Sequence, residues 1–304
     1  MKNRFKLLSL LAFGSITLSG CYIDLGFIKI GSKEETNTAD GKLIYDAEKQ
    51  NAHILEYYST IDSSQSGDTL LSALRTLNLG KRKSEVGYSE MGSNSSGKVK
   101  FTDYDPAYVK FNSDGIPYGT RILSFYSGKS VTTFDREHVW PASRLSGGRD
   151  NNIVDDDILM PRPTCSEENQ DRGNSAYVTG VADGSSGWDP VTAFEKTLGT
   201  YEGIRGECAR IIFYCCLVDS RCQITDSAAY EGYGVPKMGK ISDLMEWACE
   251  NPVNMREKRR QVGAEYLQGN RNAFVDHPEY ACKIWGTSSD RARAACKKAN
   301  YPVQ

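Results

Sequence analysis

The amino-acid sequence predicts an α+β protein, a mostly helical single domain around a small antiparallel hairpin. Three observations support this prediction. Apolar residues recur at helical spacing along much of the chain, alternating β-forming residues gather in one stretch before Trp140, and no internal repeat divides the 304 residues. Once a signal and a tether are set aside, about 260 residues remain, which suits one domain with its own core.

The chain begins with a segment typical of a bacterial lipoprotein signal. A basic head, Lys2 to Lys6, precedes an apolar stretch that is too short to span a bilayer, and Leu-Ser-Gly follows directly before Cys21. Such signals are cleaved before the cysteine, so we expect residues 1–20 to be removed and Cys21 to carry acyl chains. By the resemblance to such signals, Tyr22 in place of Asp after Cys21 favours the outer membrane, facing either the periplasm or the cell surface. An ordinary buried amphipathic N-terminus is the alternative.

A tether and two helices are predicted next. Residues 21–42 contain few large apolar side chains after Ile30 and are predicted to be a flexible tether. The domain is predicted over residues 43–304. Apolar residues at helical spacing predict two helices between residues 43 and 79, and the Ser/Gly/Asn-rich residues 82–98 are predicted to be a loop.

The hairpin is predicted in the middle of the chain. Residues 119–128 alternate and include β-forming side chains, so they predict a strand that leads through a short turn into a second strand. That second strand is predicted to end at Trp140, because Pro141 cannot continue it. An irregular polar loop follows from residue 143 to residue 156.

Several helices are predicted in the remaining sequence. Thr164 and Glu167 have the spacing of a capping box, which predicts a short helix that ends at Gly173. Further helices are predicted over residues 203–216, 244–249 and 255–267, the last closed by Gly269.

Cysteine usage predicts disulfides. Besides Cys21 the chain holds Cys165, Cys208, Cys215, Cys216, Cys222, Cys249, Cys282 and Cys296. An even number in an exported chain indicates disulfide bonds, although spacing alone selects no pairing. A zinc site is the weaker interpretation, because no two cysteines have CxxC spacing.

The charge balance excludes a strongly basic nucleic-acid-binding protein. The formal net charge is −2 at pH 7. Basic residues cluster only locally, at Arg256, Lys258, Arg259 and Arg260. This cluster predicts either a local contact with a polyanion or a solvated helix face.

His138, one of three histidines, lies beside Glu137 and before an apolar Val-Trp-Pro run. A neutral imidazole can accept a proton from water near pH 7. Carboxylate and amide oxygens, which Glu137 and Asn169 supply, suit Mg²⁺. Arg149 follows two glycines and can offer a planar set of donors to phosphate. The alternatives are a buried structural histidine, a surface carboxylate and a capping amide.

Motifs in a fixed order cover most of the mature chain. They are Arg136-Glu137-His138-Val139-Trp140-Pro141, Gly147-Gly148-Arg149, Asp157 with Pro163, residues 168–174, residues 268–279 and Trp285. On these residues the sequence resembles the bacterial endonuclease I family, secreted or periplasmic nucleases with a ββα-metal, or His-Me finger, site. The resemblance implies a ββα-metal core over about residues 119–174.

The resemblance also implies roles for individual residues. His138 would be the general base, and Glu137 with Asn169 would hold one divalent ion, Mg²⁺ or another such as Ca²⁺ or Mn²⁺. Arg149 would stabilise the phosphate, and Asp155 would lie near the waters of the ion.

Two more residues of the matching motifs, Arg172 and Asn174, would contact substrate. The implied activity is cleavage of DNA and RNA to 5′-phosphate ends with little sequence preference, which suits contacts to phosphate and sugar. No protein partner is expected, and the chain is expected to be a monomer anchored to the membrane through Cys21.

One departure from the family supports a rival hypothesis. Residues 158–161 read Ile-Leu-Met-Pro where relatives usually continue Leu-His-Asn-Leu, so a polar pair that could brace the metal site is apolar here. The rival is a catalytically inactive lipoprotein that keeps the fold as a nucleic-acid-binding or adhesive module. A phosphodiesterase specific for a small or lipid-linked substrate is a third hypothesis, and it would need a closed pocket.

The late motif has two interpretations. Either Asn270, Arg271, Asn272 and His277 face the substrate, or Gly269 and Pro278 organise a tight loop that packs on the hairpin. We favour the structural interpretation. His53, at helical spacing beside apolar residues, is also expected to be structural.

Overall fold

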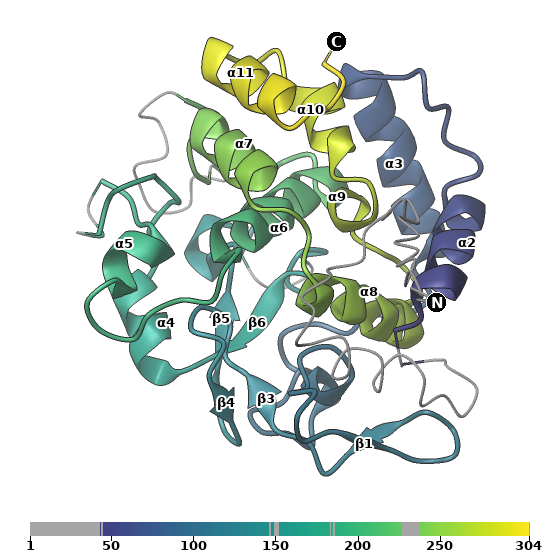
Figure 1. Ribbon diagram of the computed structural model, residues 1–304, viewed down its shortest axis with the longest axis vertical. Helices are drawn as coiled ribbons and strands as arrows, with labels where there is room; N and C mark the ends of the chain where they lie inside the picture. Colours follow the sequence, from purple (N-terminus) through teal and green to yellow (C-terminus); the bar gives the residue numbers. More distant parts are fainter. Residues whose placement is uncertain are drawn as a thin grey trace, which may run out of the picture.

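Helices are the main regular elements of the described residues, and the strands associate in short antiparallel pairs (Figure 1). The computed structural model describes residue 43 and residues 45–145, 147–148, 152–182, 184, 186–226 and 238–303. The expected signal, lipidated cysteine and tether lie outside these residues. Within them, no helix is long and apolar enough to cross a membrane. The predicted class, mostly helical α+β, is confirmed.

The secondary structure is as follows. The α-helices are α2 Ala47–Tyr57, α3 Gly67–Lys81, α4 Ser166–Arg172, α5 Pro190–Phe194, α6 Ile204–Val218, α7 Ile241–Glu250, α8 Met255–Gln268, α9 Ala273–Asp276, α10 Glu279–Trp285 and α11 Asp290–Lys298. The 3₁₀ turns are η1 Lys98–Phe101 and η2 Ala142–Arg144. The strands are β1 Lys110–Phe111, β2 Pro117–Tyr118, β3 Ile122–Leu123, β4 Ser130–Val131, β5 Asp135–His138 and β6 Pro161–Thr164.

Helix α6 is the centre of the core. All of its residues are buried except Arg205, because the helix is apolar on nearly every side. Helices α3, α5, α7 and α9 pack around it (Figure 1). Its two buried charges are paired: Arg210 Nε lies 2.6 Å from Glu257 Oε2 of α8, and Glu207 pairs with Arg162 of β6.

The helices agree with the prediction in the long segments and differ in the short ones. The two N-terminal helices and the helices now seen as α6, α7 and α8 are confirmed, and Gly269 ends α8 with a φ of 92°. Helices α5, α10 and α11 were not predicted, because they are too short to show a clear period. The capping box is wrong: α4 begins after Cys165, and Thr164 Oγ1 donates to Glu168 Oε2 at 2.7 Å.

The hairpin differs from the prediction in its partners. Strand β5 ends at His138 and pairs with β6, so that Glu137 lies opposite Arg162. Of the strand expected over residues 119–128, only β3 forms, and it pairs with β4. Strand β6 was missed because two of its four residues are prolines. In an antiparallel pair every second N–H points away from the partner, so alternate prolines are tolerated there.

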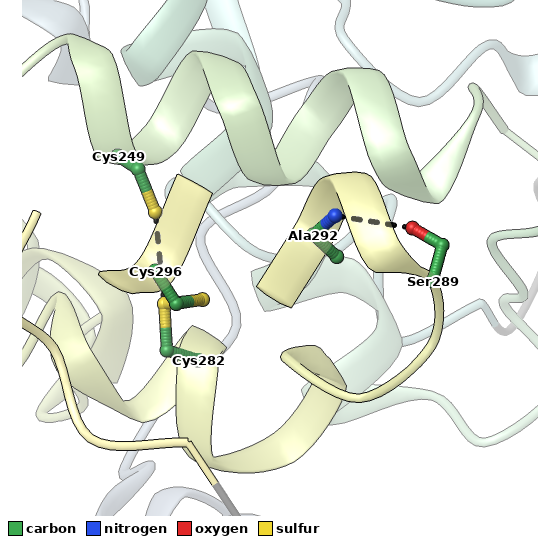
Figure 2. Close-up of a disulfide and its surroundings, with 5 residues drawn as sticks. All are labelled: Cys249, Cys282, Ser289, Ala292 and Cys296. Atoms are coloured by element: carbon green, nitrogen blue, oxygen red, sulfur yellow. Dashed lines mark hydrogen bonds between the residues drawn. A yellow bond between two sulfur atoms is a disulfide. The ribbon is translucent and has the colours of Figure 1, made fainter. Parts of the chain in front are cut away.

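One disulfide forms among the described residues, and it joins two C-terminal helices. Cys282 of α10 and Cys296 of α11 are bonded, and Ser289 caps α11 by accepting from Ala292 N at 3.1 Å (Figure 2). Cys249 of α7 is a thiol whose Sγ lies 3.6 Å from Cys282 Sγ.

The expected disulfides are confirmed for one pair only, and the other six cysteines are free thiols. The six free thiols are Cys165, Cys208, Cys215, Cys216, Cys222 and Cys249. Four of them are buried in or beside α6, where a thiol packs as a small apolar side chain.

The position of Cys249 predicts different outcomes for the two ends of the bridge. We expect Cys282→Ser to lower the free energy of unfolding by about 3 kcal/mol, the value for a closed loop of this length. Cys296→Ser should lose less, because Cys249 is close enough to form a new bond with Cys282. Urea unfolding and non-reducing peptide mapping measure both effects, with Cys165→Ser as the control. Equal losses, with no new bridge in Cys296→Ser, would contradict the prediction.

Candidate active site

His138 is the last residue of β5, and its side chain reaches solvent. Val139 and Trp140, which follow it, are fully buried, and Trp140 Nε1 donates to Arg144 O at 3.1 Å. These apolar side chains anchor the end of the strand, whereas the His138 side chain remains 11% exposed. The apolar run therefore fixes the strand, and His138 is not a core histidine.

Asp155 faces His138 from the loop before β6. Its Oδ1 lies 2.5 Å from His138 Nε2. The loop is ordered at this point because Asn152 Oδ1 accepts from Val154 N at 3.0 Å and Asn152 O accepts from Asp155 N at 2.9 Å. A carboxylate on one ring nitrogen orients an imidazole and selects its tautomer. The structure thus places Asp155 on the histidine itself.

Glu137 lies on the opposite face of β5 and is 1% exposed. Tyr126 Oη donates to Glu137 Oε1 at 2.7 Å, and Arg172 Nη1 lies 3.3 Å from the same oxygen. Burial raises the pKa of Glu137 to about 7; Arg172 and Tyr126 oppose this rise, and the neighbouring Glu168 adds to it. The ionised carboxylate is therefore disfavoured unless more positive charge comes close.

Glu168 is a second buried carboxyl to which the sequence assigned no role. Its Oε2 accepts from Ser124 Oγ and Thr164 Oγ1, each at 2.7 Å, while its Oε1 is buried without a hydrogen-bond partner. The bonds to Ser124 and Thr164 join α4 to the loop after β3 and to the end of β6. The signal that could have found it is its place beside Asn169 within a matching motif.

The unit β5-β6-α4 holds both expected ion ligands. Helix α4 packs against β5 (Figure 1), so Asn169, which is half-buried, and the buried Glu137 come from neighbouring elements. One carboxylate and one amide oxygen are hard ligands, and they fit an ion such as Mg²⁺ that keeps several waters.

Arg172 takes a different place from the one expected. Its guanidinium is 1% exposed and donates to His138 O at 2.9 Å and to Val139 O at 2.7 Å, besides its contact with Glu137. The expected contact of Arg172 with substrate is therefore wrong, because its buried side chain instead ties α4 to β5. Asn174 is exposed, and its carbonyl accepts from Arg144 Nε at 2.9 Å.

Arg149 lies outside the described residues. The two glycines before it have φ values of 84° and 80°, a left-handed conformation that other residues rarely adopt. Glycine is therefore the residue that suits both of these positions.

The departure at residues 158–161 falls in the core. Ile158, Leu159 and Met160 are at most 2% exposed and belong to the main hydrophobic cluster. Apolar side chains therefore suit these positions in this chain, and the rival hypothesis of an inactive protein stays a question for the activity assay.

The late motif is structural, as favoured. Asn270, Arg271 and Asn272 are at most 2% exposed. Asn270 Nδ2 donates to Tyr214 Oη at 2.7 Å, and Arg271 Nε donates to Asp276 Oδ2 at 2.7 Å. These side chains pack inside the domain and do not face substrate. The expected packing on the hairpin is wrong, because Asn270 contacts Asn78 of α3 and Tyr214 of α6.

The other two histidines also have structural contacts. His53 Nε2 lies 2.7 Å from Glu265 Oε1, which agrees with its expected role. His277 stacks on Tyr280 with ring centroids 4.6 Å apart.

Comparison with known proteins finds a family match over most of the chain. The sequence model of the family Endonuclease I matches residues 78–279. An extracellular ribonuclease of Bacillus amyloliquefaciens is 31% identical over 244 residues, which cover 76% of this chain and 78% of that protein. An extracellular ribonuclease of Bacillus subtilis (strain 168) is also 31% identical over 244 residues, covering 75% of this chain and 78% of its own length.

The buried pair of Glu137 and Arg172 predicts a large loss of stability when one partner is removed. We expect Arg172→Met to lower the free energy of unfolding by about 3–5 kcal/mol, because it leaves a buried carboxyl without its cation. The control is Arg293→Met, which breaks an exposed pair with Asp290 and should cost about 1 kcal/mol at most. Urea unfolding measures both, and similar small losses in the two variants would contradict the prediction.

The raised pKa of Glu137 predicts how stability depends on pH in protein freed of divalent ions. The folded state keeps a proton on Glu137 up to about pH 7, whereas the unfolded chain loses it near the ordinary value of 4.5. The stability from this proton is present below the unfolded pKa and is lost as the pH rises through 7. Between pH 4.5 and 7.5 the wild type should lose about 3 kcal/mol more than Glu137→Gln. If the free energy of unfolding, measured with urea, changed equally with pH in the wild type and in Glu137→Gln, the prediction would be contradicted.

Proposed function

Since this chain belongs to the endonuclease I family, we propose that it hydrolyses phosphodiester bonds of DNA and RNA to 5′-phosphate ends, with little sequence preference. The observation that carries the proposal is the His138–Asp155 pair at the end of β5, 2.5 Å apart and in contact with solvent. The extracellular ribonucleases that the chain resembles support a nucleic-acid substrate.

His138 acts as the general base. With the proton on Nε2 held by the Asp155 carboxylate, Nδ1 is the nitrogen that accepts a proton from the attacking water. Asp155 then stabilises the imidazolium that forms, because a carboxylate at 2.5 Å favours the charged ring. The paired side chains thus both orient the base and balance its charge.

Glu137 and Asn169 hold one divalent ion, Mg²⁺ or another such as Ca²⁺ or Mn²⁺. The fit rests on charge: Glu137 and Glu168 are two neighbouring buried carboxyls, the Arg172 guanidinium contacts only Glu137 of the two, and Glu168 Oε1 has no hydrogen-bond partner. When bound, the ion neutralises charge on the phosphate and the departing oxygen. Tyr126 and Arg172 orient the Glu137 carboxylate by binding its Oε1.

Arg149 and the N-terminal segment complete the proposal. By family resemblance Arg149 stabilises the phosphate. We expect export through the signal over residues 1–20, which the extracellular relatives support, and we also expect lipid on Cys21 to anchor the protein to the outer membrane.

The test compares two histidine variants of the full-length chain, purified in detergent. Release of acid-soluble fragments from plasmid DNA and from RNA is measured with Mg²⁺ and with EDTA. We expect His138→Ala to lose about 10²- to 10⁴-fold in rate, the usual contribution of a general base. His53→Ala, the matched control at a partly exposed histidine, should cut like the wild type.

Each outcome has a distinct meaning. Loss of cutting in EDTA and its return with Mg²⁺ would support the ion at Glu137 and Asn169, and cutting by His138→Ala at the wild-type rate would reject the base. A folded wild type that binds nucleic acid in Mg²⁺ without cutting it would instead indicate the inactive binding lipoprotein.

A further inference from the structure

Tyr88, in the loop between α3 and η1, covers the imidazole of His138. The two rings stack with centroids 3.9 Å apart and planes 26° from parallel. The guanidinium of Arg136 lies over the same tyrosine ring, 4.1 Å from its centroid. Because Arg136 and His138 are two residues apart on β5, their side chains project from the same face of the strand. The ring of Tyr88 therefore lies between them.

The backbone of Tyr88 is attached to the same two elements that supply His138 and Asp155. Tyr88 N donates to Asp155 O at 3.0 Å, and Arg136 Nη1 donates to Tyr88 O at 2.9 Å. Val86, which precedes Tyr88 in the chain, forms an isolated β-bridge with Asp157, which follows Asp155. The loop is thus held against both β5 and the segment that presents Asp155.

Gly87 permits this close attachment. A Cβ atom at residue 87 would lie 2.3 Å from Asp155 O and 2.5 Å from Asp156 Cα, closer than side chains and backbone approach. Only glycine lets the loop come this near to the backbone of Asp155. The sequence places that glycine directly before the residue that stacks on His138.

We propose that Tyr88 is a positioning residue that fixes the plane of the His138 imidazole while Asp155 fixes its direction. A single hydrogen bond to Nε2 still allows the ring to tilt and to rotate about the bond. The Tyr88 residue is itself held by Arg136 and by the hydrogen bond from its N–H to Asp155 O, so stacking against its ring removes that freedom. The inference rests on the proposed function, in which His138 must present Nδ1 to water.

The same geometry argues against Tyr88 as a surface for stacking nucleotide bases. A tyrosine that binds single-stranded nucleic acid offers a free ring face to a base. The Tyr88 ring lies between the His138 imidazole, which covers one of its faces, and the Arg136 guanidinium. The ring is therefore already engaged. The two roles predict different kinetics, because a stacking residue affects substrate binding and a positioning residue affects the chemical step.

The test uses Tyr88→Ala, Tyr88→Leu and Tyr88→Phe in the full-length chain. We expect Ala and Leu to lower kcat by about 10- to 100-fold with KM within about threefold, since misplacing a catalytic group by about 1 Å can cost 100-fold. Phe keeps the stacked ring and should stay within about threefold of the wild type. The control is Tyr108→Ala, an exposed tyrosine under Arg121, which should change neither constant.

Nuclear magnetic resonance gives a readout that does not depend on activity. The His138 ring protons, assigned by their absence in His138→Ala, should be shifted upfield by the Tyr88 ring in the wild type and in Tyr88→Phe. This shift should disappear in Tyr88→Ala and Tyr88→Leu. Circular dichroism and thermal unfolding show whether each variant is folded, and Tyr88→Leu retains the apolar bulk of the site.

The outcomes separate this inference from the proposed function. An active wild type with an inactive His138→Ala, but with wild-type kcat in Tyr88→Ala, overturns the role of Tyr88 alone. So does a loss confined to KM, a Tyr88→Phe variant as slow as Tyr88→Ala, or the absence of an upfield shift. A folded wild type that does not cut overturns the proposed function and, with it, the role of Tyr88.

Discussion

The guanidinium of Arg172 is the contact on which the arrangement of the site depends. It is buried at the end of α4, where it meets the Glu137 carboxylate and donates to the carbonyls of His138 and Val139. One side chain therefore joins the helix of the ββα unit to the strand that carries both His138 and Glu137. Because the contact is buried, its hydrogen bonds do not compete with water, and the end of β5 is held in one position.

A second set of buried charges supports strand β6 from the other side. Asp103 accepts from Arg162 Nε at 3.1 Å and pairs with Arg260 of α8, which also donates to Pro161 O at 2.9 Å. Arg162 in turn pairs with Glu207 of α6. A short strand with two prolines has few ladder hydrogen bonds of its own, so these side chains supply the contacts that keep it beside β5. The basic residues near Arg260 are thus partly internal and do not form a single solvated face.

The sequence predicted more of the chemistry than of the path of the chain. His138, Glu137 and Asn169 are recognisable because their residue types and order suit phosphodiester cleavage, and the structure places them on β5 and on α4, which pack together. Tyr88 was not recognisable, since a tyrosine in a Ser/Gly/Asn-rich loop has no pattern that links it to a histidine 50 residues later. The buried role of Arg172 was also hidden, because an arginine in a matching motif has the same letter whether it meets substrate or a carboxylate.

The sequence by itself determined the class of the fold, the long helices, the apolar anchor after His138 and the family. These follow from periodicity, glycine and proline positions and residue order, which are local properties of the chain. Only the tertiary structure decided that β5 pairs with the proline-containing β6, that Asp155 and Tyr88 meet His138, and that a single pair of cysteines is bonded among the described residues. The physical reason is that these contacts join segments far apart in sequence, and their free energy comes from burial and hydrogen bonding that exist only once the core has formed.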